Sequence, residues 1–341
     1  MKRDILAQLA QKASERGGYI NAHSHLDIAH VLELSSFKQA TSELGLSDPY
    51  QAGELPLPVK MDILDRRMRT AEDYLSTLSS RIESTLQAFL EQGVVACRTC
   101  ITISKEVGSK PIEIAASLKQ KYAGLLELQI VPLHLHSLLE HADERAYFET
   151  ICRHEAVDVI GALPQLEKDV PSFLDLLFQI AQATDKPVEI HSDEYIDADE
   201  NETELIALKA IEMRQKGYTR GISAVHCVTL ACKAPAERAR VIELLRRGMV
   251  DVVVCPRAAL SMRNLDCATY MHNSIAPVRE LLDGGVVVAI GTDNIHDVFL
   301  PFSDGLIADE IEFLAEAIRM YDIEKLVDLV SSNGRKVLGL R

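Results

Sequence analysis

The chain has 341 residues, of which 47% are hydrophobic and 26% are charged, a composition ordinary for a soluble globular protein with one large domain or two. Its net charge is −15, and no run of lysine and arginine is long enough to form a phosphate-binding stripe, so nucleic acid is not an expected partner. Residues 1–18 look like an amphipathic helix, and no stretch reaches membrane-spanning length, so we expect no membrane association.

The seven cysteines are scattered and lie mostly in apolar runs. We therefore expect reduced thiols in a cytoplasmic protein. Cys97 and Cys100 form a nominal C-x-x-C, but in a strand-like run positions three apart point to opposite faces. No second pair completes a zinc ribbon, so both are expected to pack in the core.

Short β-branched runs alternate with helix-period segments along the chain. The expected strands are 18–23, 94–102, 126–134, 157–163, 187–192, 221–227, 251–255 and 286–292. The expected helices are 72–92, 111–122, 137–153, 171–184, 201–216, 234–247, 273–283, 304–320 and 323–337. Glycines before strands, where a helix C-terminus needs a residue that tolerates positive φ, are at 93, 217, 248 and 285.

Strand–helix alternation repeated eight times predicts a parallel sheet closed into a (β/α)8 TIM-type barrel, an α/β fold. An open doubly wound sheet is the alternative, disfavoured because no G-x-G-x-x-G turn follows the first strand. We expect residues 1–341 to form a single barrel domain, with one long loop insertion at about 30–69 after the first strand. This loop leaves from the active-site end of that strand and is either a lid over the substrate or a surface excursion.

Four strand-like runs end in histidine or aspartate, at the end of the barrel where such a fold places its active site. His23 and His25 are two apart on a strand, so both point to the same side and offer two ligands to a metal ion. His191 and Asp293 can complete a set of three nitrogens and one carboxylate, which suits Zn²⁺ or Fe²⁺ better than Mg²⁺ or Ca²⁺. Such an ion lowers the pKa of bound water and supplies hydroxide as a nucleophile.

Two further residues are candidates for catalysis. Glu194, three residues beyond His191, is placed to move protons between water and substrate. His226 can hold the hydroxide or polarise the forming oxyanion. A single histidine at a strand end is more often a hydrogen-bonded structural residue, but four such endings in register with eight strands favour a site.

The ordered set of these motifs resembles the amidohydrolase superfamily. The motifs are H-x-H at His23 and His25, H-x-D-E at 191–194, the sixth-strand His226 and G-T-D at 291–293. Within the superfamily, 160–164 followed by 191–194 is similar to cytosine deaminases, and 291–299 resembles the N-isopropylammelide amidohydrolases. The resemblance covers roughly residues 18–335.

The resemblance implies a metal-dependent hydrolase fold with one divalent ion per chain, Zn²⁺ or Fe²⁺. The implied ligands are His23, His25, His191 and Asp293. The implied catalytic residues are the proton shuttle Glu194, the hydroxide-orienting His226 and the metal-binding Asp293. No lysine occurs in 157–165 to bridge a second ion, which favours one metal over two.

The chain also departs from this family. Members usually frame the barrel with a small β-sandwich, whereas here we expect little or no flanking sandwich. The glutamine that reads the pyrimidine edge in cytosine deaminases is absent from 131–136, which disfavours cytosine itself. Asn294 stands where those enzymes have a second aspartate, and Phe299 matches an aromatic that packs on the ring. With Gln165, these two residues are the expected substrate contacts.

We therefore predict a hydrolytic deaminase of a nitrogen heterocycle, such as a pyrimidine or triazine, that releases ammonia or an alkylamine. Glu194 favours this reaction because a ring nitrogen must be protonated as hydroxide attacks. The alternative is an amidohydrolase that cleaves a cyclic or linear amide C–N bond on the same site. A non-enzymatic binding barrel is disfavoured by the intact ligand set. The expected partner is a small heterocycle, and because barrels of this kind commonly self-associate, a homo-oligomer is a further expectation.

Overall fold

The computed structural model describes every residue except 1, 196, 198, 262–273 and 341. The strands are β1 (Tyr19–Asn21), β2 (Val94–Ile103), β3 (Glu127–His134), β4 (Ile160–Ala162), β5 (Val188–Ser192), β6 (Ile222–His226), β7 (Asp251–Val254) and β8 (Val288–Ile290). The helices before β5 are α1 (Lys2–Glu15), α2 (Ser35–Glu43), α3 (Leu57–Asp62), α4 (Glu72–Glu91), α5 (Lys110–Tyr122), α6 (Ala142–Cys152) and α7 (Val170–Thr184). Those after β5 are α8 (Glu202–Gln215), α9 (Pro235–Gly248), α10 (Pro256–Ser261), α11 (Val278–Asp283), α12 (Ile307–Ile318), α13 (Ile323–Leu329) and α14 (Ser332–Leu338).

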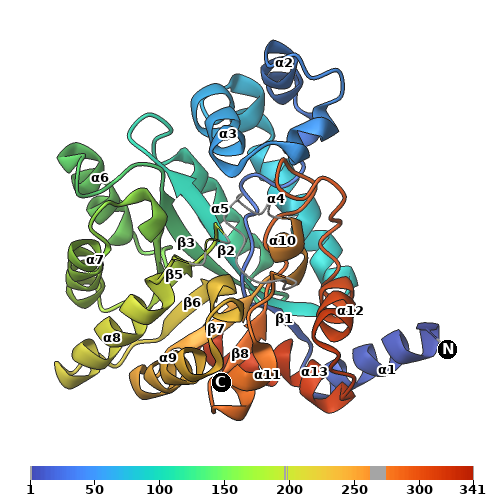
Figure 1. The fold of residues 1–341 in the computed structure, drawn as a ribbon. Coiled ribbons are helices and arrows are strands. Elements are labelled where there is room, and N and C mark those ends of the chain that lie inside the picture. The colour runs from blue at the N-terminus through green and yellow to red at the C-terminus, as the bar shows by residue number, and fades with distance from the viewer. Residues whose placement is uncertain (1, 196, 198, 262–273, 341) are drawn as a thin grey trace.

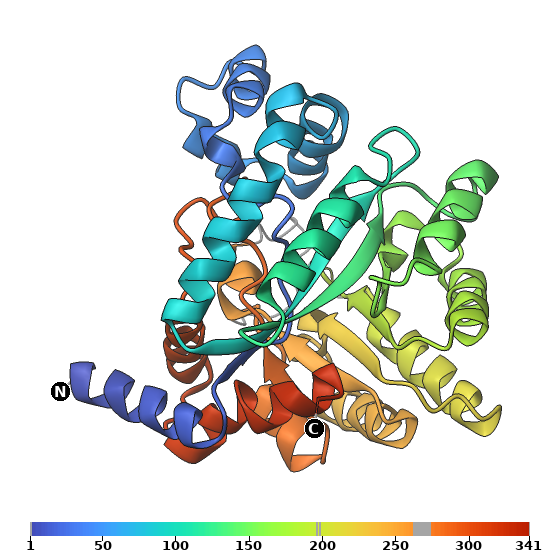
Figure 2. The same cartoon turned by 180° about the vertical axis from the view of Figure 1, so that it is seen from behind.

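The strands close into a parallel barrel surrounded by helices (Figure 1 and Figure 2). Strands β1 to β3 pair in sequence order, and so do β4 to β8. Backbone bonds join the two groups at both seams: the Asp158 amide donates to the Ile130 carbonyl at 3.0 Å, and the Ala22 amide donates to the Ile290 carbonyl at 3.0 Å. The predicted (β/α)8 barrel is confirmed. All strands in the described part of the chain belong to it, and no flanking sandwich is present there.

The seam between β8 and β1 depends on close backbone approach. A Cβ atom at Gly291 would lie 2.6 Å from the His23 carbonyl oxygen, so only glycine fits there. Next to it, the buried Asn21 side chain accepts from the Thr292 amide at 3.0 Å and donates to the Thr292 hydroxyl at 2.8 Å. The G-T-D run therefore closes the barrel as well as presenting Asp293.

Two predicted helices differ from those observed. The segment expected as one helix at 323–337 forms two helices, α13 and α14. The helix is interrupted near Ser331, whose hydroxyl donates to the Val327 carbonyl. The helix expected at 137–153 begins only at Ala142. Residue 273, the expected start of another helix, lies outside the described residues; α11 begins at Val278.

Three of the four predicted positive-φ glycines have that conformation: Gly93, Gly217 and Gly285. Gly248 does not; the left-handed residue is its neighbour Met249, with φ of 51°. A Cβ at Gly248 would lie 3.0 Å from the Ala210 Cβ and 3.1 Å from the Ala207 carbonyl oxygen. The absence of a side chain there allows α9 to approach α8 closely.

The six cysteines in the described residues are free and buried, and Cys267 lies outside those residues. Cys97 packs in the main hydrophobic core, while Cys100 packs with Val131 and Leu133 in a smaller cluster. None of the helices in the described part of the chain combines the length and the apolar character needed to cross a membrane.

The segment 30–69, which we call the cap, contains the short helices α2 and α3 and a π-helical turn at Ile63–Met68. Both views show α2 and α3 together at one end of the molecule (Figure 1 and Figure 2). The cap has its own buried apolar cluster, which includes Phe37, Leu64, Met68 and, from outside the cap, Tyr74 and Val298.

A buried ion pair ties the cap to the barrel. Arg69 donates to Asp27 at 2.7 Å and to Asp65 at 3.0 Å, and the second partner of Asp27 is the Thr102 amide at 3.0 Å. Burial acts to raise the pKa of Asp27, but the charge of Arg69, the effect of His25 and the hydrogen bonds from Thr102 and Arg69 together outweigh it and hold this pKa below its ordinary value. Asp27 is therefore ionised at neutral pH, and the cap is fixed to the barrel rim.

We expect Asp27→Asn to lower the free energy of unfolding by about 3–5 kcal/mol at neutral pH, because it leaves the Arg69 charge in a buried site without its full partner. Urea unfolding of metal-free protein measures this change. The exposed pair of Lys105 and Asp143 provides the control, since Asp143→Asn should have little effect. Because the folded-state pKa of Asp27 is depressed, its contribution is present above the unfolded-state pKa and is lost as pH falls through the folded-state value. Equal stability of both variants at neutral pH would contradict the role of the pair.

Candidate metal centre and active site

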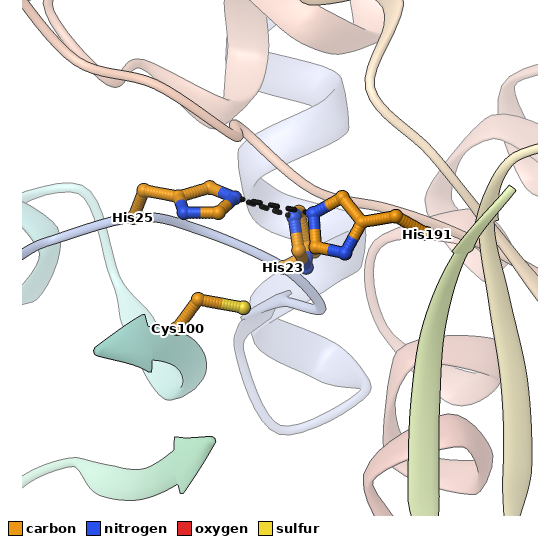
Figure 3. A group of neighbouring side chains, drawn as sticks. All are labelled: His23, His25, Cys100 and His191. Carbon is orange, nitrogen blue, oxygen red and sulfur yellow. Dashed lines mark hydrogen bonds between the residues drawn. The ribbon is translucent and has the colours of Figure 1, made fainter. Parts of the chain in front are cut away.

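Three imidazoles and one carboxylate converge at the C-terminal ends of the strands. The Nε2 atom of His25 lies 3.2 Å from that of His23 and 3.4 Å from that of His191 (Figure 3). Oδ1 of Asp293 lies 3.4 Å from Nε2 of His25 and 3.7 Å from Nε2 of His23. The four predicted ligands thus meet, although His23 and His25 follow β1 and are not within it.

These donor atoms fit one transition-metal ion. A tetrahedral ion with ligands at about 2.0–2.1 Å separates its nitrogens by about 3.3 Å, close to the spacing of the imidazole Nε2 atoms. Burial, the largest effect, lowers the pKa of His25 and His191, so both are neutral, as ligands must be. Three nitrogens and one carboxylate suit Zn²⁺ or Fe²⁺ better than the oxygen-seeking Mg²⁺ or Ca²⁺.

Three polar residues at strand ends have left-handed backbones. The φ angles are 53° at Asp193, 73° at His226 and 59° at Asp293. Such a conformation costs a non-glycine residue about 1–3 kcal/mol and persists only where the surroundings hold it. At Asp293 the seam does so, because its amide donates to the His23 carbonyl at 3.0 Å and its carbonyl accepts from the His25 amide at 3.1 Å.

His226 lies beside this cluster. Its Nε2 atom is 3.9 Å from Oδ2 of Asp293, is buried, and has no hydrogen-bond partner among the described residues. Burial lowers the pKa of His226 to about 4, against the opposing effect of Asp293. The ring is therefore neutral at pH 7 and has a nitrogen free to bind a ligand at the cluster.

Glu194 also faces the site. Its Oε2 atom accepts from the Gln165 side-chain amide at 2.9 Å. Burial, followed by the charges of Asp293 and Glu200, raises the pKa of Glu194 to about 8. The neighbouring Asp193 carboxylate has a different role, because it accepts from the amide and the hydroxyl of Thr203 at the start of α8.

A cavity of about 340 Å³ lies over the cluster. The three predicted substrate contacts, Gln165, Asn294 and Phe299, all line it. The side-chain amide of Asn294 donates a hydrogen bond to Asp297 at 2.7 Å. This bond fixes the orientation of the Asn294 side chain. The cap supplies one wall of the cavity through Leu57, Pro58, Met61, Asp62, Leu64 and Asp65.

Cys100 is a site neighbour that the sequence did not reveal. Its Sγ atom belongs to a group of donor atoms, with His23, His25 and His191, that all lie within 4.8 Å of one another (Figure 3). Burial raises the pKa of Cys100 well above its ordinary value, so it is a thiol. Alternation along β2 separates Cys97 from Cys100, but it does not say which of the two faces the barrel axis.

Comparison with known proteins agrees with this geometry. The sequence profile of the amidohydrolase family matches residues 17–341. The chain is 25% identical to a pterin deaminase of Rhizobium rhizogenes over 345 aligned positions, which cover 98% of this chain and 73% of the relative. It is 21% identical to an N-isopropylammelide isopropyl amidohydrolase of Pseudomonas sp. strain ADP, over 73% of this chain and 59% of the relative.

Solved structures share the fold. A 5-methylcytosine deaminase from Klebsiella pneumoniae liganded with 5-fluorocytosine superposes with a TM-score of 0.81 at 21% identity, over 94% of this chain and 74% of that one. An N-isopropylammelide isopropylaminohydrolase from Burkholderia multivorans gives a TM-score of 0.72 at 18% identity, over 94% and 74% of the two chains. Since the family profile spans all eight strands and the whole cluster of histidines and Asp293, the chain belongs to the amidohydrolase family of metal-dependent hydrolases.

Proposed function

We propose that this protein hydrolytically deaminates a nitrogen heterocycle, releasing ammonia or an alkylamine. The observation that carries the proposal is Glu194, a half-buried carboxyl whose pKa is raised to about 8, beside the cluster of three histidines and Asp293 in a partly enclosed cavity. The similarity to a pterin deaminase along nearly the whole chain supports a ring substrate. Pyrimidines, triazines and pterins are the candidate rings.

In this proposal His23, His25, His191 and Asp293 would hold one divalent ion, Zn²⁺ or Fe²⁺, which when bound activates water for attack on a ring carbon. Glu194 delivers a proton to the ring nitrogen as the oxygen adds, takes one back from the added hydroxyl group, and passes it to the departing amine. Its raised pKa suits this task, since in the metal-free protein the carboxyl carries a proton at neutral pH. The bond from Gln165 limits the orientations of that carboxyl.

His226 and the cavity walls complete the proposed site. In this proposal His226, whose Nε2 atom lies 3.9 Å from Asp293 and has no partner among the described residues, hydrogen-bonds the oxygen that adds to the ring carbon. Phe299 offers an aromatic face to a flat ring, and Asn294 lies next to Asp293 at the cavity wall. In this proposal the cap covers the substrate and excludes water. Of the two interpretations of segment 30–69, the proposal therefore takes the lid and not the surface excursion.

A substrate panel tests the reaction. Metal-loaded protein should release ammonia or an alkylamine from at least one amino- or alkylamino-substituted pyrimidine, triazine or pterin, measured by a coupled ammonia assay and by mass spectrometry of the product. Cyclic and linear amides form the second arm of the panel. Turnover of amides with no turnover of any aminated ring would replace deamination with amide hydrolysis.

The metal content of ligand variants tests the assignment of the metal ligands. Purified protein should hold close to one transition-metal ion per chain, and His23→Ala or Asp293→Ala should lose it because the remaining ligands leave an incomplete shell. Elemental analysis after dialysis gives the metal content. The exposed His141 supplies the control variant His141→Ala, which should keep its metal. Full occupancy in both ligand variants would refute the ligand assignment.

Glu194→Gln separates catalysis from binding. The substitution keeps the size and the acceptor for Gln165 but cannot carry the proton, so we expect turnover to fall by about 10²–10⁴-fold. Metal content and inhibitor affinity should stay near those of the parent protein. Glu140→Gln, at an exposed carboxylate paired with Lys168, is the matched control and should keep its turnover. Near-normal turnover in Glu194→Gln would move the proton transfer to another residue.

A further inference from the structure

A buried carboxylate contacts one of the predicted metal ligands. Glu189 is on β5, two residues before His191, and its side chain is fully buried. Its Oε1 atom lies 2.9 Å from Nδ1 of His23, and its Oε2 atom accepts from Nη1 of Arg98 at 2.9 Å. The guanidinium of Arg98 is always charged, and Glu189 is its partner in a buried ion pair. The group is thus an anion between a ligand and a cation.

Arg98 is itself buried and held by several hydrogen bonds. Its Nε atom donates to the Gln129 side chain at 3.0 Å, Nη2 donates to the Val337 carbonyl at 3.0 Å, and Nη1 also reaches the Ser223 hydroxyl at 3.3 Å. Gln129 in turn donates to the Leu338 carbonyl at 2.8 Å. The guanidinium is therefore fixed by β3, β6 and the end of α14, and it fixes Glu189.

We propose that Glu189, held by Arg98, is a positioning residue that presents His23 to the metal. An ionised carboxylate can only accept, so Nδ1 of His23 must carry the proton and donate it. Nε2 of His23 is then left with its lone pair facing His25 and Asp293. A histidine ligand whose other nitrogen donates to a carboxylate has a fixed tautomer and ring orientation and is a stronger donor. The inference depends on the metal centre proposed above and is independent of the substrate.

A purely structural role for this pair is less satisfactory. A buried ion pair stabilises a fold no better than well-packed apolar side chains of the same volume, because both charges lose their hydration. The carboxylate also divides its two oxygens between Arg98 and His23, where a pair built only for charge compensation would use both on the guanidinium fork. This division links the barrel core to one ligand nitrogen.

Glu189→Gln tests the inference with little change in shape. Arg98 has only donors, so it orients the carbonyl oxygen of the substituted side chain towards itself and leaves the new amide group facing Nδ1 of His23. That nitrogen must then accept, which moves the ring proton to Nε2 and blocks the metal-binding position. We expect affinity for Zn²⁺, measured by competition with a chromophoric chelator, to fall by about 10–100-fold. The control is Glu167→Gln, a buried carboxylate bonded to Ser137 and Leu138, which should bind Zn²⁺ as the parent does.

A spectroscopic readout separates positioning from general damage. Nitrogen NMR of histidine-labelled, metal-free protein, recorded at a pH where the His23 ring is neutral, should show the His23 proton on Nδ1 in the parent and on Nε2 in Glu189→Gln. If Glu189→Gln does not fold, Glu189→Asp keeps the charge for Arg98 but withdraws the carboxylate from His23, and its Zn²⁺ affinity should also fall. Parent-like affinity in a folded Glu189 variant, or an Nε2 proton on His23 in the parent, would overturn the inference. Loss of metal in His23→Ala with full affinity in Glu189→Gln would overturn it while leaving the metal centre intact.

Discussion

Closure of the barrel between β8 and β1 is the constraint on which the site depends. The ligands His23 and His25 follow the first strand, and Asp293 follows the last, so only the seam brings them together. Gly291 permits the close approach, and the paired side chains of Asn21 and Thr292 set the register of the two strands. The backbone bonds across this seam also hold Asp293 in its left-handed conformation. Closure of the barrel therefore sets the position of this ligand as well.

Burial determines the charge of each group around the centre. Where a buried carboxylate is paired with an arginine, as at Asp27 and Glu189, its pKa is lowered and it is an anion. Where it has other carboxylates nearby, as at Glu194, its pKa is raised and it holds a proton. The same low dielectric environment therefore yields anions that orient their neighbours and, at Glu194, a carboxyl suited to proton transfer.

The strand ends were predictable because parallel barrel strands are continuous apolar runs, and a polar residue stands out where such a run stops. Glu189 could not be predicted as part of the site, because it lies inside one of these runs and its partner Arg98 is distant in sequence. The same holds for Cys100, whose environment depends on which face of β2 points inward. The cap helices α2 and α3 have 9 and 6 residues, which is too short for a helical period to show clearly in the sequence. The residues at the rim of the site were thus predictable from the sequence, and those in the barrel interior were not.

The seam has a consequence for the order of assembly. Asn21 and Thr292, which clamp it, are 271 residues apart, so a ribosome exposes the first two ligand histidines long before Asp293 has been made. Those two histidines alone form an incomplete site, whose preference follows the general affinity order of divalent metals and not the geometry of the protein. The complete seat exists only after the eighth strand has joined the first, so selective metal loading follows translation. The choice of ion then depends on the finished pocket and on the metals available in that compartment at that moment.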